Sequence, residues 1–257
     1  MSSAPSSGTP GQLSRGVHDP AALPGVKALL FDTFGTVVDW RSSLIAELTG
    51  FGRRKGVAAD WTLLVDEWRA AYHPSMDRVR NREQPWTSLD ELHRQSLEKL
   101  VAALGIAGVG ADELDELTGA WRRLHPWPDA VEGLERLASR YILGPLSNGN
   151  VSLLVRLRKF AGLPWDVILG ADLWRHYKPD PEAYQGACRL LDLRPGEVML
   201  VAAHNDDLRA ARGQGLRTAF VPRPAEYGPR QRKDIAPEAA WTVVASDFKD
   251  LAFLLGA

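Results

Sequence analysis

The stretch Val26-Lys27-Ala28-Leu29-Leu30-Phe31-Asp32-Thr33-Phe34-Gly35-Thr36 is the part of the sequence that points most directly to a fold. Its first six residues form a short apolar run, which predicts a buried parallel strand. The strand would end at Asp32, and Thr33-Phe34-Gly35-Thr36 would form the turn that follows. A carboxylate at a strand tip is a candidate nucleophile, and an aspartate that only caps the turn is the structural alternative.

Strands and helices alternate in the second half of the chain. Strands are expected at 141–146, 167–169, 198–202 and 218–221, and helices at 131–139, 152–161, 181–191, 207–214 and 248–255. This alternation predicts an α/β fold, a doubly wound, Rossmann-like parallel sheet with right-handed crossovers. Ligands bind such sheets at the carboxyl ends of the strands, so Asp32, Ser147 and the residues after Val201 should meet at one edge.

Residues 40–125 have a different character, because helices are expected at 43–51, 61–72, 89–104 and 112–124 with no clear strand among them. Leucines recur at three- and four-residue steps between Leu89 and Leu104, which is typical of an amphipathic helix. We predict a helical cap at 40–125, inserted into a core formed by 26–39 and 126–257. Residues 1–25 are rich in Ser, Pro and Gly without an apolar h-region, which predicts a flexible lead docked by Leu23 rather than a signal peptide.

The composition narrows the function classes. The 257 residues carry 31 Lys and Arg against 32 Asp and Glu, a net charge of −1, which argues against a surface built for nucleic acid or anionic membrane. No apolar run approaches the roughly 20 residues that a transmembrane helix needs. The lone cysteine, Cys188, excludes an intrachain disulfide and a thiolate zinc site. We expect Cys188 to be a buried core thiol in a cytoplasmic protein.

Three motifs in order resemble those of the haloacid dehalogenase superfamily. They are Phe31-Asp32-Thr33-Phe34-Gly35-Thr36, Leu146-Ser147-Asn148-Gly149 and Lys178-Pro179-Asp180. Each follows a predicted strand or lies in the next loop, and the resemblance covers the chain from Val26 to its end. Three motifs in the right order are far more specific than any one of them.

Within that superfamily the chain is most similar to the 2-haloacid dehalogenase (type II) branch. The likeness rests on Trp68-Arg69 in the predicted cap, Tyr184 six residues after Lys178, and Asp207. The stretches Pro145-Leu146-Ser147-Asn148-Gly149-Asn150 and Ala202-Ala203-His204-Asn205 also resemble members that remove fluoride.

The resemblance implies a role for each residue at the strand tips. Asp32 would attack an sp³ carbon to form an ester that water then hydrolyses. Lys178 would keep Asp32 ionised and balance the substrate's charge. Thr36 would support the Asp32 loop through a hydrogen bond. The substrate-binding residues would be Thr33, Phe34, Ser147, Asn148 and Tyr184.

Two of these groups have alternative interpretations. Ser147 and Asn148 would supply donors for a substrate carboxylate, and both could also cap the following helix. Arg69 lies among Trp68 and Tyr72, where a weakly hydrated guanidinium suits the binding of a leaving halide. The alternative is a surface arginine stacked on Trp68.

The sequence departs from the superfamily's phosphatases at two metal-related positions. Phe34 replaces the second aspartate that serves as general acid and base, and Ala202-Ala203 replaces the Gly-Asp pair that helps to hold Mg²⁺. We therefore expect neither a metal nor a cofactor. The adjacent Asp206 and Asp207 could form a metal pair, but Asp206 is better explained as an acid at a helix N-terminus.

His204 occupies a position where the branch would usually have asparagine. At a strand tip near the nucleophile it could activate the hydrolytic water, donate a hydrogen bond to halide or carboxylate, or serve as a neutral spacer, and these roles stay open. Asp207 would orient His204 or bind the water itself. His93 and His176 form no ligand pattern and are expected to be structural.

The sequence thus predicts a cofactor-free hydrolase that converts short 2-haloalkanoic acids, including haloacetates, to 2-hydroxy acids and halide. The resemblance implies inversion at C2, a preference for L substrates and a homodimer, and no nucleic-acid or membrane partner is expected. Phe34 and Trp40 would narrow the pocket. The alternatives are a Mg²⁺-dependent phosphatase on the same fold and a non-catalytic protein that binds a small carboxylate or another protein.

Overall fold

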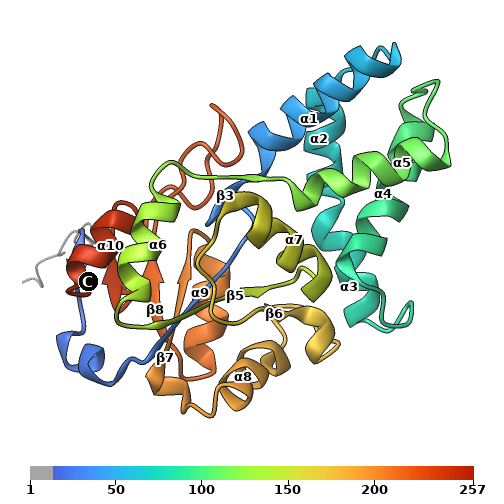
Figure 1. The fold of residues 1–257 in the computed structure, drawn as a ribbon. Helices are drawn as coiled ribbons and strands as arrows, with labels where there is room; N and C mark the ends of the chain where they lie inside the picture. Colours follow the sequence, from blue (N-terminus) through green and yellow to red (C-terminus); the bar gives the residue numbers. More distant parts are fainter. Residues whose placement is uncertain (1–13) are drawn as a thin grey trace, which may run out of the picture.

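A seven-stranded sheet in the order β1-β9-β8-β7-β2-β5-β6 forms the centre of the larger part of the molecule (Figure 1). The computed structural model describes residues 14–257. The strand β2 (Ala28–Phe31) lies parallel to β5 (Ile142–Ser147) on one side and β7 (Val198–Ala202) on the other. The outer strands are β6 (Leu169–Gly170), β8 (Arg217–Phe220), β9 (Val243–Val244) and the antiparallel β1 (Gly16–Val17).

Helices cover both faces of this sheet, which confirms the doubly wound α/β fold. Leu29 and Phe31 of β2 pack on the face covered by α6 (Ala130–Ala138), α7 (Val151–Ala161) and α10 (Phe248–Leu254). Ala28 and Leu30 point to the other face, under α8 (Pro181–Leu190) and α9 (Asn205–Gly213). A strand buried on both faces is uniformly apolar, which is why 26–31 shows no polar alternation.

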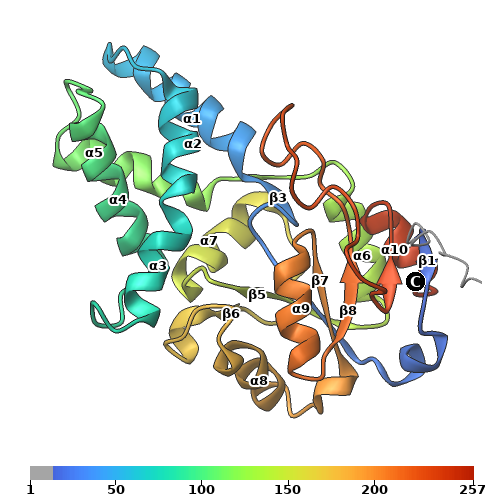
Figure 2. The same ribbon diagram turned by 180° about the vertical axis from the view of Figure 1, so that it is seen from behind.

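A second group of helices lies beyond one side of the sheet, as Figure 2 shows from behind. These helices are α1 (Trp40–Lys55), α2 (Trp61–Ala70), α3 (Tyr72–Arg80), α4 (Leu89–Ala103), α5 (Ala111–Thr118) and the 3₁₀ turn Gly119–Arg122. The short strands β3 (Val38–Asp39) and β4 (His125–Pro126) pair antiparallel where the chain enters and leaves this group. We propose the cap boundaries at 40 and 125 on this pairing.

Two helices of this group differ from the sequence-based expectation. The helix expected at 61–72 ends at Ala70, and α3 follows from Tyr72 to Arg80. Pro74 lies in the first turn of α3, where the missing N–H breaks no helical hydrogen bond. The helix expected at 112–124 ends at Thr118 and continues as a 3₁₀ turn.

The N-terminal region is more ordered than composition predicts. Residues 1–13 of the expected flexible lead lie outside the described residues, but 14–25 form β1 and a 3₁₀ helix, Pro20–Gly25. Gly16 and Val17 pair with Val244 and Val243, and Leu23 packs against the core. Backbone pairing to a sheet edge needs few apolar side chains, so a Ser-, Pro- and Gly-rich segment can still be ordered. Across residues 14–257, no helix combines the length and apolarity required to cross a membrane.

Candidate active site

Asp32 lies at the carboxyl end of β2 and is 8% exposed. Its Oδ1 accepts one hydrogen bond, from Lys178 Nζ at 2.9 Å. Its Oδ2 accepts two, from Thr36 Oγ1 at 2.8 Å and from the His204 ring at Nδ1 at 3.0 Å. The two oxygens are therefore not equivalent, because Oδ1 has a lone pair that no protein donor uses.

The strand ends bring the predicted residues together at one edge of the sheet. Lys178 lies in the loop before α8, where its backbone N–H donates to Asn148 Oδ1 at 2.7 Å. The Thr36 hydroxyl accepts from the Ala203 N–H at 2.9 Å, so its proton points toward Asp32. Thr36 thus supports Asp32 directly, as the sequence predicted.

Lys178 forms ion pairs with both Asp32 and Asp207, and its side chain is almost fully buried. Asp207 lies in the first turn of α9, and Tyr184 donates to its Oδ1 at 2.7 Å. Burial alone would lower the pKa of Lys178, but Asp207 and Asp32 outweigh burial and raise it. Lys178 is therefore a cation in the resting site, and Tyr184 contacts Asp207, the second carboxylate that pairs with Lys178.

The two carboxylates beside Lys178 have opposite pKa shifts. Burial opposes the ionisation of Asp32, yet Lys178 and His204 together hold its pKa well below the usual range. Burial raises the pKa of Asp207, against the attraction of Lys178. Asp32 is thus a stable anion, and Asp207 is the stronger proton acceptor.

His204 is held between two carboxylates. Its Nδ1 lies 3.0 Å from Asp32 Oδ2, and its Nε2 lies 2.8 Å from Glu226 Oε2. Ionised carboxylates only accept hydrogen bonds, so both ring nitrogens must carry a proton. Burial would lower the pKa of His204, but Glu226 and Asp32 outweigh it and raise the pKa well above its usual value. A doubly protonated ring has no lone pair for water, so the general-base role considered for His204 does not fit this geometry.

The sequence did not reveal Glu226 at this site, nor the cavity-lining residues His73, Tyr227 and Lys233. Glu226 lies in the loop between β8 and β9, 22 residues after His204, and is 0% exposed. Trp40 Nε1 donates to its Oε1 at 3.0 Å. Gly35 makes room for it, since a Cβ at Gly35 would lie 2.1 Å from Glu226 Oε1, and its φ of +93° also favours glycine. A lone glutamate in a polar loop carried no periodic or motif signal.

Arg69 reaches the site from α2 and is 9% exposed, which excludes the surface-arginine alternative. Its guanidinium lies 4.2 Å from the centre of the Tyr72 ring and 5.2 Å from that of Trp40. One of its amino nitrogens lies 3.8 Å from Glu226 Oε1, whereas the buried Nη1 has no hydrogen-bond partner. A buried, unpartnered donor on a permanent cation is suited to bind an anion.

A cavity of about 140 Å³ connects these groups. Its lining includes Asp32, Lys178 and Asp207 together with Phe34 and Arg69. Further lining residues are Tyr72, His73, Asn148, Pro179, Tyr184, His204, Asp206, Tyr227 and Lys233. The cavity thus combines a carboxylate nucleophile with several cations.

Three residues do not line the cavity as the sequence suggested. Ser147 is buried and its hydroxyl accepts from the Gly149 N–H at 3.1 Å, which fixes the loop after β5. Thr33 is also buried, and its hydroxyl has no partner. Trp40 acts through its bond to Glu226 rather than by narrowing the pocket. Ser147 therefore fixes the backbone beside the site, and Asn148 is the residue of the Leu146-Ser147-Asn148-Gly149 motif that lines the cavity.

The donor set does not fit Mg²⁺. The Lys178 ammonium already bridges Asp32 and Asp207, and Phe34 and Ala203 contribute no side-chain oxygen. Asp206 is not paired with Asp207 for ligation, because it forms ion pairs with Arg209 and Lys233 instead.

The other residues singled out lie away from the nucleophile. His93 is buried and stacked on Trp121, with ring centres 4.0 Å apart, which fits a structural role. His176 does have metal-ligand spacing to Asp180 and Glu182, contrary to expectation, although the cluster is partly exposed. Cys188 is a buried free thiol, as predicted.

Known proteins are similar to this chain over most of its length. A family profile described as haloacid dehalogenase-like hydrolase matches residues 26–215. The (S)-2-haloacid dehalogenase 4A of Burkholderia cepacia is 31% identical over 213 residues, which cover 80% of this chain and 88% of that protein. The (S)-2-haloacid dehalogenase of Xanthobacter autotrophicus is 30% identical over 209 residues, 77% of this chain and 76% of that protein.

Two solved structures are more similar still. The L-2-haloacid dehalogenase PA0810 has 54% sequence identity and a TM-score of 0.88, over 90% of this chain and 99% of the other. The defluorinating L-2-haloacid dehalogenase Rha0230 has 50% identity and the same TM-score, over 90% of this chain and 96% of the other.

Proposed function

Because the chain belongs to the 2-haloacid dehalogenase branch of the haloacid dehalogenase superfamily, and is a hydrolase acting on carbon–halide bonds, we propose that it converts short 2-haloalkanoic acids to 2-hydroxy acids through an ester on Asp32. The observation that carries this proposal is the state of Asp32 Oδ1. It belongs to an anion, it accepts a single hydrogen bond, and its residue lines the cavity. Such an oxygen can attack carbon directly.

In the first step, Asp32 Oδ1 forms a bond to C2 of the substrate as the carbon–halogen bond breaks. The electron pair leaves with the halide, which needs no proton because it is a weak base. Arg69 Nη1, buried and without a partner, would bind the departing halide. Attack from the face opposite the halogen would invert C2, and the substrate carboxylate would lie near the Asn148 amide, which faces the same cavity.

In the second step, water attacks the carbonyl carbon of the ester. Asp207, whose pKa burial raises, would take the proton of the water. The bond between that carbon and Oδ1 then breaks, and the leaving alkoxide takes a proton from Lys178, which regains one from Asp207. The product hydroxyl therefore carries the former Oδ1, and an oxygen from water replaces it on Asp32.

The small cavity favours substrates of acetate or propionate size, including haloacetates. The Mg²⁺-dependent phosphatase has less support, because an ammonium occupies the space between the two carboxylates and no acid stands at Phe34. A non-catalytic carboxylate binder would not need a nucleophile held ionised by two cations.

The test is a halide-release panel with fluoro-, chloro- and bromoacetate and both enantiomers of 2-chloropropionate, run with and without a strong chelator. We expect halide and hydroxy acid from haloacetates and from one enantiomer, at rates the chelator does not change. An aryl phosphate assayed with Mg²⁺ is the parallel arm. Phosphate release that requires Mg²⁺, without halide release, would favour the phosphatase, and the absence of both activities would favour the binder.

A further inference from the structure

We infer that Glu226 is a positioning residue that keeps His204 doubly protonated, so that the His204 Nδ1–H and the Thr36 hydroxyl together stabilise the oxyanion that forms on Asp32 Oδ2 during ester hydrolysis. The inference rests on the proposed function and assigns its second step to particular donors. It also gives His204 a role different from water activation.

The geometry of Oδ2 supports this assignment. If Oδ1 forms the ester, Oδ2 becomes the ester carbonyl oxygen and gains negative charge when water attacks. Its two donors, Thr36 Oγ1 at 2.8 Å and His204 Nδ1 at 3.0 Å, are already in place. These are the distances at which oxyanion donors act, and the donors need no rearrangement as the charge develops.

Electron and proton balance are complete in this step. Water forms a bond to the ester carbon, its proton goes to Asp207, and the carbonyl π pair moves to Oδ2. His204 keeps both protons and only donates a hydrogen bond. The pair on Oδ2 then returns and expels Oδ1 with the product. The regenerated Asp32 carboxyl carries the second proton of the water and releases it to solvent, so each turnover yields one proton together with the halide.

The charges around His204 explain why it stays protonated. Glu226 faces it from the loop between β8 and β9, and Asp32 faces it from β2. Arg69 from α2 lies against Glu226, and His73 from α3 shares the cavity. Burial, Arg69 and Lys233 lower the pKa of His73 to about 4, so His73 adds no positive charge at neutral pH.

The protonated state also balances the whole site. With His204 charged, three carboxylates face three cations, and with His204 neutral, buried Glu226 would keep only Arg69, at 3.8 Å. A buried charge without a close partner is strongly unfavourable. The balanced set comprises Asp32, Asp207 and Glu226 with Lys178, Arg69 and His204.

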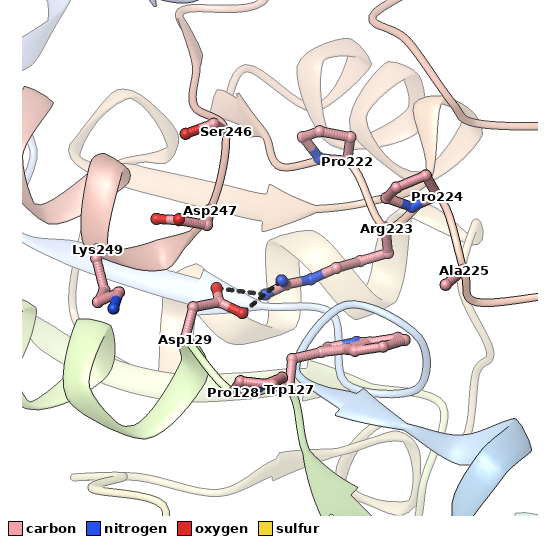
Figure 3. Close-up of a pocket in the computed structure, with 10 residues that line it drawn as sticks. All are labelled: Trp127, Pro128, Asp129, Pro222, Arg223, Pro224, Ala225, Ser246, Asp247 and Lys249. Atoms are coloured by element: carbon pink, nitrogen blue, oxygen red, sulfur yellow. Dashed lines mark hydrogen bonds and ion pairs between the residues drawn. The ribbon is translucent and has the colours of Figure 1, made fainter.

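Glu226 is fixed in position by its own segment. The Glu226 N–H donates to the Arg223 carbonyl at 3.1 Å. Arg223 binds Asp129 through two bonds of 2.7 and 2.9 Å, beside Trp127 (Figure 3). Its Nε also donates to the Thr36 carbonyl at 2.9 Å. The segment that carries Glu226 is therefore tied to the turn that carries Thr36.

The test is Glu226→Gln, with Glu238→Gln as the matched control in the same loop, where Glu238 is exposed and pairs with Arg209. The introduced amide can accept from Trp40 through its oxygen and present its NH₂ to His204 Nε2. The ring then stays in place as a neutral Nδ1–H donor, so the variant removes charge and little else. We expect ester hydrolysis at mildly alkaline pH to slow roughly 10- to 100-fold, because charge-assisted hydrogen bonds are the stronger kind.

Three readouts separate this effect from a structural one. Intact mass should show accumulated ester while the rate of alkylation stays within about twofold of wild type. Hydrolysis by the variant should recover as the pH is lowered from the alkaline side into the range where His204 regains a proton while Asp207 is still ionised. The ¹⁵N NMR signals of labelled His204 should report an imidazolium in resting wild type and a neutral ring in the variant at the same pH.

A double-mutant cycle with His204→Asn provides the second arm. Asparagine donates without charge, so Glu226→Gln should cause no further loss of hydrolysis in that background. If Glu226 acted only by supporting Trp40 or Arg69, its loss would slow the reaction by the same factor in both backgrounds.

The outcomes distinguish this inference from the proposed function. If Glu226→Gln hydrolyses the ester at the wild-type rate, or if His204 is neutral in resting wild type, the inference is wrong although the ester mechanism stands. If wild type forms no ester, the proposed function is wrong, and so is the oxyanion role that depends on it.

Discussion

The two sides of Asp32 repeat one arrangement with different consequences. On one side Lys178 lies between Asp32 and Asp207, and on the other His204 lies between Asp32 and Glu226. Each side is therefore a cation between two carboxylates. The difference lies in the outer carboxylate, because the pKa of Asp207 is raised by burial whereas that of Glu226 is lowered, burial being outweighed by His204 and Arg69.

This difference suggests a division of labour. The Lys178 side ends in a carboxylate that readily accepts a proton, and it borders the oxygen that attacks carbon. The His204 side ends in a carboxylate that stays ionised, and it borders the oxygen that holds the developing charge. In the proposed mechanism the Lys178 side moves protons, and the His204 side holds charge in place.

Loss of the shared carboxylate should have the largest effect. Asp32→Asn should reduce turnover by roughly 10⁴-fold or more, because an amide oxygen is a poor nucleophile. Halide release measures the effect, and a thermal melt within a few degrees of wild type would show that the fold persists. Substantial turnover that survives the change, with no covalent adduct, would mean that water attacks the substrate directly.

Asp207→Asn tests the proton-moving side and should lower ester hydrolysis by roughly 10²- to 10³-fold. The ester on Asp32 should accumulate, and intact-mass spectrometry after mixing with chloroacetate should show a carboxymethyl adduct. Lowering the pH from the alkaline side should not restore this variant, whereas it should restore Glu226→Gln as long as Asp207 stays ionised. In wild type, activity should fall on acidification as Asp207 gains a proton, since its raised pKa places that loss nearer neutrality. Equal pH profiles for Asp207→Asn and Glu226→Gln would contradict the division of labour between the Lys178 side and the His204 side.

Arg69→Lys should impair the departure of halide by roughly 10-fold, mostly in kcat. Lysine keeps the charge but lacks the planar fork whose Nη1 is buried without a partner. Steady-state kinetics with chloroacetate separates the two parameters. A raised KM with unchanged kcat would instead assign Arg69 to the substrate carboxylate.

The smallest expected effect is a difference of about twofold in the fraction of ¹⁸O label that passes from the enzyme to product. It tests whether Asp32 Oδ1 and Oδ2 keep their positions between turnovers. After one turnover in ¹⁸O-labelled water, the label should lie on Asp32 in the position of Oδ1, with no label in the product. Enzyme returned to ordinary water should then pass nearly all of that label to the next product molecule. Transfer of only half would mean that the carboxylate rotates between turnovers, despite Thr36 and His204 on Oδ2.

Most of the candidate site residues that could be identified from the sequence lie directly after a predicted strand or within a short motif. Asp32 follows an unbroken apolar strand, and Lys178 and Asp207 match motifs of a known family at fixed places after strands, so periodicity together with that resemblance placed them at one edge of the sheet. The fold followed from the same alternation. Helix ends were less certain: the α2 to α3 boundary at Ala71 has no strong stop signal, and packing decides it.

Sequence by itself predicted the doubly wound fold from strand periodicity, and the resemblance of its motifs to a known family predicted Asp32 as the nucleophile and Lys178 as the cation beside it, because periodicity and motif spacing are properties of neighbouring residues. Only the tertiary structure decided the protonation of His204 and the part played by Glu226. Glu226 reaches the site from a loop without regular periodicity, through the space that Gly35 leaves open, and its charge acts over a contact of 2.8 Å between residues 22 positions apart. Electrostatics depends on distance and burial in space, which a linear pattern does not contain.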